Sequence, residues 1–483
     1  MSNGDVLISR PLSISENFFR SRTASGHYRS FAVSSTYNQN LNNLSLFYKA
    51  LRKTILEYHI LICNVQFKGQ YVYQPLENIK LENILQFNTD VQYLRNGVVT
   101  ESFMKKVNEI TFNLYTQDPL FKLVLVGDYN LVCIFEHTIA DGVVGNYFHE
   151  IFLQNLAYCD DTNNDVFAVS FGDVPEEISL DTTIFNFSKD LKFIKNSLPP
   201  PLDLFMEDID LDYTYNNPDF FERVIPQCYK RWNGRFDAIN THEISFKVIN
   251  FNLEETKQIL NACKKHNVTL TSYIVVIEAL TLQPIFGDNY TVHKVAMALR
   301  RHIQKDKAPI EYQQILSDPN YKILGTSAHM GFGNNIPPLK KFSWNAVKEV
   351  NDNILQSTKN KRALNQMKGW KDKGDLLDPT NQSFFDSQLN KPKADHVKFS
   401  NLGLIKLPEY KVKDKKIWKI ENMIFWQDMA PYSAEFMLSA VSTPLGGLNF
   451  VLSYYDYTFD DIPGDNFDKY IIQLHDNMLN CAS

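Results

Sequence analysis

Long apolar runs are absent from this 483-residue chain. A helix that crosses a bilayer needs ~20 apolar residues, and the best stretch, SYIVVIEALTL (272–282), has about half of that. This stretch is typical of a core helix. The N-terminal segment MSNGDVLISRPLSISENFF lacks the apolar centre of a secretory signal. The sequence therefore predicts no transmembrane segment and a cytoplasmic location.

Neither sign of charge is in strong excess, and cysteines are few. The formal net charge is −6, which gives no electrostatic footprint for nucleic acid. The six cysteines are widely scattered and form no CxxC pair, so a zinc site or a dithiol redox motif is not expected. Their apolar neighbours predict reduced, buried thiols.

Several common catalytic and nucleotide-binding motifs are also missing. No G-x-S-x-G elbow of serine hydrolases, no P-loop and no dinucleotide G-x-G-x-x-G occurs. The lone G-x-G at residues 331–333 is more typical of a turn. The H-E-x-x-H motif of zinc proteases is absent as well, so the sequence predicts no metal.

One stretch concentrates the chemistry that is present. Residues 131–142 read LVCIFEHTIADG: a β-branched and aromatic run predicts a buried strand, and apolar residues at helical spacing follow. PLFKLVLV (119–126) predicts the partner strand of a hairpin. His137 would lie in the loop between strand and helix, where catalytic side chains are common. A buried structural histidine with a helix-capping Asp141 fits the local pattern equally well.

Helix and strand patterns alternate along the chain, which predicts an α/β or α+β fold. We expect three parts: residues 1–190 as an N-terminal half that carries His137, residues 191–240 as a crossover linker, and residues 241–483 as a C-terminal half. The linker contains SLPPPLDLF and an acidic, turn-rich segment.

Within these halves the patterns predict individual elements. We expect helices at 44–58, 100–109, 253–266, from Thr269 onward, from Trp344 onward and at 466–479. We expect strands at 60–67, 243–251, 293–300, 397–405, 420–427, 435–443 and 448–455, and a Gly/Asn loop at 325–338.

With rival motifs absent, a single histidine acting as general base is the chemistry that remains. An imidazole can take a proton from an attacking hydroxyl or amine near neutral pH without a metal. Asp141 would orient the loop through an ion pair with Arg300 or Arg301, because a charge near the core needs a partner. Cys133 lies on the same strand face as His137, and we expect it to be a core thiol rather than a nucleophile.

Residues 137–142, HTIADG, match the HxxxDG motif of CoA-dependent acyltransferases, a superfamily that includes chloramphenicol acetyltransferase, plant BAHD enzymes and condensation domains. FSNLGLI (399–405), FWQ (425–427) and STPLGGLNFVLS (442–453) resemble the C-terminal blocks of fungal alcohol acetyltransferases. HMGFGNN (329–335) and VAMALR (295–300) sit where that family has comparable strands. The DFGWG block of plant enzymes is absent.

The resemblance implies two similar chloramphenicol-acetyltransferase-like halves with a tunnel between them. It implies acetyl-CoA as co-substrate with no bound cofactor, and His137 as general base for direct transfer in a ternary complex. Asp141 would be structural, paired with Arg300, and Gly142 would let the helix start close to the catalytic strand.

The C-terminal blocks that carry the resemblance supply further candidates. Ser400, Asn401 and Gln427 are candidates for polar contacts with the thioester or CoA. A strand-end turn is the alternative interpretation of Ser400 and Asn401.

The resemblance gives a leading function and two alternatives. The leading function is transfer of acetyl from acetyl-CoA to the hydroxyl of a small or amphipathic alcohol. The first alternative is N-acetylation of sphingoid-base-like long-chain amino alcohols or related inhibitors. The second is a non-catalytic binding protein on the same scaffold. We expect a monomer without a nucleic-acid partner, cytoplasmic or peripheral to the endoplasmic reticulum or lipid droplets.

Overall fold

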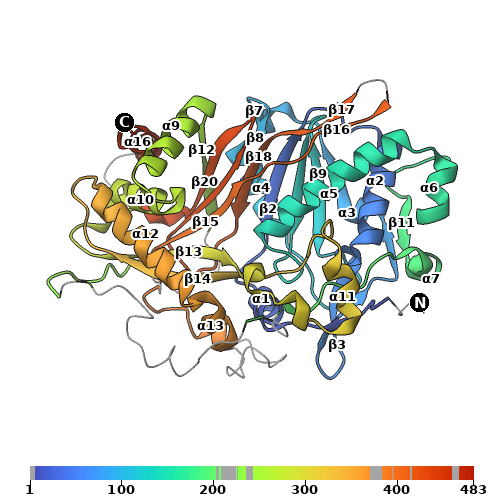
Figure 1. The fold of residues 1–483 in the computed structure, drawn as a ribbon, viewed down its shortest axis with the longest axis horizontal. Coiled ribbons are helices and arrows are strands. Elements are labelled where there is room, and N and C mark those ends of the chain that lie inside the picture. Colours follow the sequence, from blue (N-terminus) through green and yellow to red (C-terminus); the bar gives the residue numbers. More distant parts are fainter. Residues whose placement is uncertain are drawn as a thin grey trace.

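The chain forms two mixed α/β lobes that lie side by side (Figure 1). The computed structural model describes residues 6–202, 206–207, 225, 227–234, 243–369, 383–393, 395–413, 416–459 and 467–483. One lobe is built around a five-stranded sheet and is called the N-terminal lobe, and the other, around a six-stranded sheet, is called the C-terminal lobe. The predicted α/β class with two halves is confirmed.

The sheet of the N-terminal lobe has the order β18-β2-β10-β9-β6. The predicted hairpin at its centre is confirmed, since β9 and β10 pair antiparallel from Phe121↔Phe135 to Val126↔Asn130. The strands are β2 (Phe31–Tyr37), β6 (Leu85–Asn88), β9 (Phe121–Val126), β10 (Asn130–Phe135) and β18 (Ile420–Gln427).

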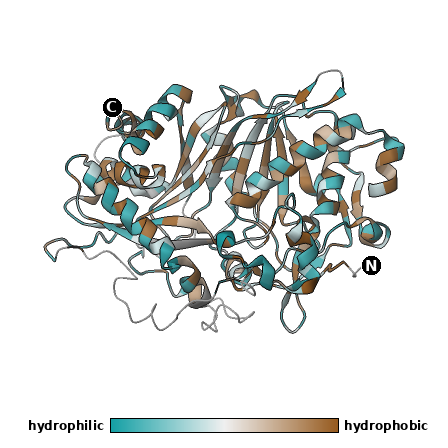
Figure 2. Ribbon diagram, viewed as in Figure 1, coloured by the Kyte–Doolittle hydropathy of each residue, from teal (hydrophilic) through white to brown (hydrophobic). Residues whose placement is uncertain are grey.

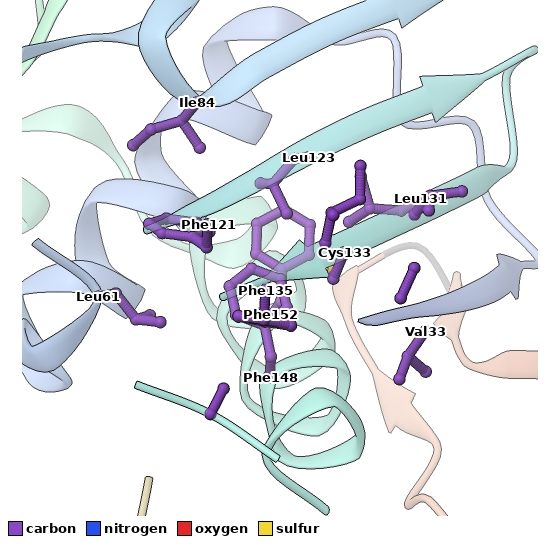
Figure 3. Close-up of a cluster of buried hydrophobic side chains, with 14 of the residues drawn as sticks. Val33, Leu61, Ile84, Phe121, Leu123, Leu131, Cys133, Phe135, Phe148 and Phe152 are labelled. Atoms are coloured by element: carbon purple, nitrogen blue, oxygen red, sulfur yellow. The ribbon is translucent and has the colours of Figure 1, made fainter. Parts of the chain in front are cut away.

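Two long helices cover this sheet, α2 (Leu44–Glu57) and α5 (Gly142–Asp161). Figure 3 shows the contact between α5 and the hairpin, where the rings of Phe121 and Phe135 meet those of Phe148 and Phe152. All four rings are fully buried. Burial of this much aromatic surface holds α5, and with it the loop that precedes the helix, against the end of β10.

The C-terminal lobe has a mixed sheet with the order β12-β20-β19-β15-β13-β14. Strand β15 runs parallel to both of its neighbours, and the other pairs are antiparallel. Hydrophilic and hydrophobic segments alternate along the outer helices α9 and α12 (Figure 2), as expected for helices with one face on a core. The elements are β12 (Ile244–Phe251), α9 (Leu253–Lys265), α10 (Leu270–Phe286), β13 (Thr291–Ala298), β14 (Ala328–Ile336), α12 (Trp344–Lys359), β15 (Val397–Leu404), β19 (Phe436–Thr443), β20 (Gly447–Tyr455) and α16 (Phe467–Asn480).

Shorter elements surround the two sheets. Those of the first 202 residues are β1 (Arg10–Pro11), α1 (Ile14–Ala24), β3 (Cys63–Phe67), β4 (Tyr71–Pro75), β5 (Asn78–Lys80), α3 (Leu81–Ile84), β7 (Leu94–Arg95), β8 (Val98–Val99), α4 (Glu101–Asn108), α6 (Asn164–Phe171), β11 (Thr183–Asn186) and α7 (Phe187–Asp190). Later ones are the 3-10 helix Leu299–His302, α11 (Ile310–Ser317), α13 (Arg362–Gly369), α15 (Ser383–Asp386), β16 (Tyr410–Lys411) and β17 (Ile417–Trp418).

One strand crosses between the lobes. Strand β18 belongs to the predicted C-terminal half, 241–483, but it pairs antiparallel with β2 of the N-terminal lobe, for example Phe425↔Val33. The half limits at residues 190 and 241 stay a prediction, because residues 203–205, 208–224, 226 and 235–242 of the expected crossover region lie outside the described residues.

Two local predictions were wrong. The Gly/Asn-rich segment 325–338, expected to be a loop, contains β14, which pairs with β13 along its length. Pairing with a neighbouring strand outweighs the low strand propensity of glycine and asparagine there. The strand expected at 60–67 begins with a 3-10 turn, His59–Ile62, and only Cys63–Phe67 is extended.

Within the described ranges, no single helix meets the requirements for crossing a membrane. Helices α9 and α10, which meet at 105°, are long and apolar enough to cross a membrane only when they are taken together as a bent pair, and only by length and composition. Helix α10 contributes fully buried side chains to the core of the C-terminal lobe, as predicted for residues 272–282.

Candidate active site

A cavity of about 510 Å³ lies where residues of both lobes meet. His137 lines it from the loop between β10 and α5, and Gly142 lines it from the first position of α5. Helix α1 and strands β13, β15 and β18 supply other walls. The lining includes Phe18, Phe19, Arg22, Tyr28, Lys294, Ala296, Gln366, Asp395, Lys398, Ser400, Phe425, Gln427, Asp428 and Tyr432.

His137 is held by aromatic rings. The Phe19 ring stacks on the imidazole with centroids 3.9 Å apart and an interplanar angle of 9°. The rings of Phe31 and Tyr28 lie 5.1 and 5.9 Å away. Nδ1 of His137 lies 3.4 Å from Oγ1 of Thr326, which belongs to the C-terminal lobe. These contacts hold the imidazole in one orientation at the cavity wall.

The same surroundings keep the His137 imidazole neutral. Burial lowers its pKa to about 3, and the nearby charge of Arg22 acts in the same direction. The Asp141 carboxylate raises the pKa, but by less than burial lowers it. A neutral imidazole has a free lone pair for a proton, which is one requirement for a general base.

Asp141 is fully buried and connects the lobes. Its Oδ1 accepts the backbone N–H of Val144 at 3.1 Å and caps the N-terminus of α5. Its Oδ2 accepts Nη1–H of Arg300 at 2.8 Å and the N–H of Ser327 at 2.8 Å. Burial favours the protonated carboxyl, yet Arg300 and these hydrogen bonds hold the pKa of Asp141 below its usual value.

The structure therefore brings Asp141 and Arg300 together, as the sequence predicts. The alternative partner, Arg301, has an exposed side chain. Arg300 lies in the 3-10 turn that follows β13, and its Nε–H also donates to the carbonyl of Ile323 at 3.3 Å. The loop that carries His137 is thus anchored in the opposite lobe.

Gly142 begins α5 at a place where a side chain would not fit. A Cβ there would lie 2.8 Å from Cδ2 of Leu402 and 3.1 Å from Cζ of Phe425. Both contacts are closer than ordinary van der Waals distance. Glycine therefore lets the helix start against β15 and β18, whereas the resemblance implied a close approach to the strand that precedes His137.

Ser400, Asn401 and Gln427 are the remaining predicted site residues, and only two of them lie on strand faces that line the cavity. Ser400 and Gln427 line the cavity, and Nε2–H of Gln427 donates to Oγ of Ser439 at 3.2 Å. Asn401, next to Ser400 on β15, does not line it. Its Nδ2–H donates to Oγ1 of Thr271 at 3.4 Å, and its Oδ1 accepts the N–H of Gly403 at 2.8 Å. Neighbouring residues of a strand point to opposite faces, which explains the difference.

Sequence reasoning missed the contribution of α1. Phe19 and Arg22 of this helix reach the cavity, although no helix was predicted there from the sequence and neither residue was named as a candidate. Ser13 and Glu16 carry the signal that would have predicted the helix, since they form a capping box at its N-terminus. Spacing by three residues then places Phe19 and Arg22 on one face.

Two other kinds of site were considered in the sequence, a cysteine nucleophile and a metal-binding cluster. Cys133 is fully buried, and burial raises its thiol pKa well above the usual value, so it is a core thiol as predicted. Across the described part of the chain, no group of three or more His, Cys, Asp or Glu side chains is arranged to hold a metal ion.

Comparisons with known proteins agree with this arrangement. The family model for alcohol acetyltransferases matches residues 13–474. The N-acetyltransferase SLI1 of Saccharomyces cerevisiae is 21% identical over 463 residues, which are 92% of this chain and 94% of that protein.

Solved structures share the fold at low identity. The trichothecene 15-O-acetyltransferase TRI3 of Fusarium sporotrichioides superposes with a TM-score of 0.63 at 12% identity, over 98% of this chain and 95% of that one. The condensation domain of the Monacolin K polyketide synthase MokA gives a TM-score of 0.55 at 12% identity, over 99% of both chains. The chain thus belongs to the alcohol acetyltransferase family and is a CoA-dependent acyltransferase.

Proposed function

We propose that the protein transfers the acetyl group of acetyl-CoA directly to the hydroxyl of an alcohol, with His137 as general base. The observation that carries this proposal is the neutral imidazole of His137, fixed by the Phe19 ring at the wall of a cavity shared by both lobes. Thr326 lies next to Nδ1, so we assign the proton-accepting role to Nε2.

The reaction then proceeds in two proton transfers. Nε2 of His137 removes the hydroxyl proton while the acceptor oxygen bonds to the thioester carbon, which gives a tetrahedral oxyanion. When the intermediate collapses, the carbon–sulfur bond breaks and the imidazolium returns the proton to the CoA sulfur. The products are an acetate ester and CoA. Ser400 and Gln427 line the cavity and are the proposed polar contacts for the thioester and its oxyanion.

Direct transfer is favoured over an acyl-enzyme. Cys133, the possible nucleophile considered in the sequence, does not line the cavity, and its thiol pKa lies well above the usual value. A thiol that stays protonated is a poor nucleophile. In this proposal Asp141 and Arg300 only position the loop that carries His137, because their charged groups are bonded to each other.

The second candidate is N-acetylation of a long-chain amino alcohol of the sphingoid-base type. The similarity to SLI1, named an N-acetyltransferase, runs over 92% of this chain and supports this candidate. His137 would serve equally well as base for an ammonium-derived amine. The two candidates differ only in the attacking atom.

Release of free CoA thiol from acetyl-CoA tests both candidates. The acceptors are a short alcohol, a long alcohol and a long-chain amino alcohol, and we expect acceptor-dependent release with at least one of them. Mild alkali then separates the candidates, because an acetate ester is hydrolysed and an acetamide is not. Without acceptor-dependent release for any member of the panel, the proposed function is wrong.

A further inference from the structure

Two lysines face each other across parallel strands in the cavity wall. Lys294 of β13 and Lys398 of β15 are register partners, and both line the cavity that contains His137. Like charges opposite each other in a sheet are destabilising. A single carboxylate lies between them: Oδ1 of Asp395 is 2.7 Å from Nζ of Lys294, and Oδ2 is 3.4 Å from Nζ of Lys398. Two cations therefore share one anion.

Arg22 adds a third cation to the same cavity. Its guanidinium carbon lies 3.6 Å from the ring centroid of Tyr28 and 4.7 Å from that of Phe19. Its Nε and Nη2 are buried, and no described residue accepts a hydrogen bond from them. Burial, together with the charges of Lys294 and Arg22, lowers the pKa of Lys398 even though Asp395 opposes this change. The three cations thus act on one another.

The other carboxyl in the lining, that of Asp428, has hydrogen-bond partners of its own. Asp428 accepts the N–H of Arg29 at 2.6 Å and Nδ2–H of Asn108 at 3.2 Å, and burial raises its pKa. Neither of these partners is one of the cavity lysines. A cavity wall with three cations and two carboxyls, of which only Asp395 pairs with the lysines, is costly in a partly desolvated place unless a further anion joins it.

We propose that the acceptor carries an acidic group, a carboxylate or a phosphate monoester, that binds between Lys294, Lys398 and Arg22 while its hydroxyl or amine faces His137. This inference rests on the proposed function. The phosphates of CoA are the other source of negative charge. The pantetheine arm separates them from the thioester, however, and the cations line the same cavity as the proposed base. We therefore assign the anion to the acceptor.

Matched acceptors test this assignment. The probes are 3-hydroxydecanoate and its methyl ester, which differ in charge but share the hydroxyl, and 2-aminodecanoate and its methyl ester for the amine case. We expect kcat/KM to be at least about tenfold higher for the acid, since hydrogen bonds to a charged group contribute on that scale. A methyl ester that is as good as or better than the acid would overturn the proposal.

Variants then locate the anion. Lys294→Met is expected to raise KM for the acid about tenfold or more and to change KM for the ester little. Lys294→Arg keeps the charge and is expected to keep the preference for the acid, which separates loss of charge from loss of fold. Lys265→Met, at an exposed position of α9, is the control. Equal losses for acid and ester in Lys294→Met would argue against the site.

Two further measurements ask whether the bound anion belongs to the acceptor or to CoA, and whether the anion site exists independently of turnover. If Lys294→Met raises KM for acetyl-CoA but not for S-acetylpantetheine, the CoA phosphates occupy the site and the proposal is wrong. Calorimetric binding of 3-hydroxydecanoate to the His137→Ala variant does not depend on turnover. If the variant binds the acid but not its ester, the anion site is supported. If, in addition, the wild type releases no CoA with any acceptor, the proposed function is rejected while the anion site is retained. Absence of binding would reject the site.

Discussion

The carboxylate of Asp141 and the guanidinium of Arg300 join the two lobes at 2.8 Å, with the Asp141 carboxylate fully buried. Asp141 ends the loop that starts at His137, and Arg300 follows β13 of the other lobe. The pair therefore sets the position of the His137 loop relative to the wall formed by β13 and β15.

Removal of one member of this pair is expected to be costly. Asp141→Ala leaves Arg300 without its carboxylate and α5 without its cap, so we expect the free energy of unfolding to fall by about 3–5 kcal/mol. Urea denaturation measures this change. Glu243→Ala, which breaks the exposed pair with Lys105, is the control and should cost at most about 1 kcal/mol. Similar losses in both variants would contradict the anchoring role of Asp141.

Loss of the proposed base is expected to affect the rate rather than the fold. General-base catalysis contributes about 10²–10⁴-fold, so His137→Ala should lower kcat by that factor while KM for acetyl-CoA changes little. Circular dichroism and a thermal melt check the fold. His475→Ala, on α16 and away from the cavity lining, is the matched control. Near-normal turnover of the His137 variant would rule out the assignment.

The pH dependence of activity is expected to distinguish the two acceptors. Because burial lowers the pKa of His137 to about 3, its imidazole stays neutral between pH 5.5 and 8. For an alcohol, kcat/KM should be flat over this range. For an amine it should rise about tenfold per pH unit, because only the unprotonated amine attacks. An inflection near pH 6.5 with an alcohol would show that His137 is not desolvated as described.

Stability should also respond to pH through buried histidines. His149 of α5 contacts the hydroxyl of Tyr37 and the carbonyl of Val33, and burial lowers its pKa to about 4. The unfolded chain binds a proton on this residue below pH 6.5 and the native state does not. The stability that His149 contributes is therefore lost as pH falls from about 6.5 to 4, by at most about 1.4 kcal/mol per pH unit.

The variant His149→Gln isolates this effect, since other ionisable groups titrate alike in both proteins. The difference in unfolding free energy between wild type and variant should shrink as the pH is lowered from 7 to 5. Urea denaturation at several pH values gives this difference. A difference that is constant or grows on acidification would contradict the lowered pKa of His149.

Local patterns predicted much of the fold and the position of His137 in a loop between a strand and a helix. The hairpin of β9 and β10, the His137 loop and α5 follow from periodicity within some forty residues of sequence. The need of a buried charge for a partner predicted an ion pair of Asp141 with Arg300 or Arg301, and the family resemblance singled out Arg300. These features depend on residues near in sequence or on a general electrostatic requirement.

Features set by contacts between distant segments could not be predicted. Strand β14 is extended because β13 pairs with it, so local composition predicted a loop there and only the family resemblance placed a strand at 329–335. Strand β18 joins the other lobe because β2 offers it an edge. The roles of Phe19 and Arg22 depend on where α1 packs, which no periodicity reveals. Likewise, only the register of β13 with β15 places Lys294 opposite Lys398.

Strand β18 also has a consequence for the order in which the protein matures. Strand β2 lies between β18 and β10 in the sheet, yet nearly four hundred residues of synthesis separate β2 from its outer neighbour. Until Ile420–Gln427 leaves the ribosome, β2 presents an unpaired edge, the kind of surface that recruits other chains. The nascent N-terminal lobe thus carries an open sheet edge until β18 has been synthesised, and pairing of β18 with β2 then completes the sheet.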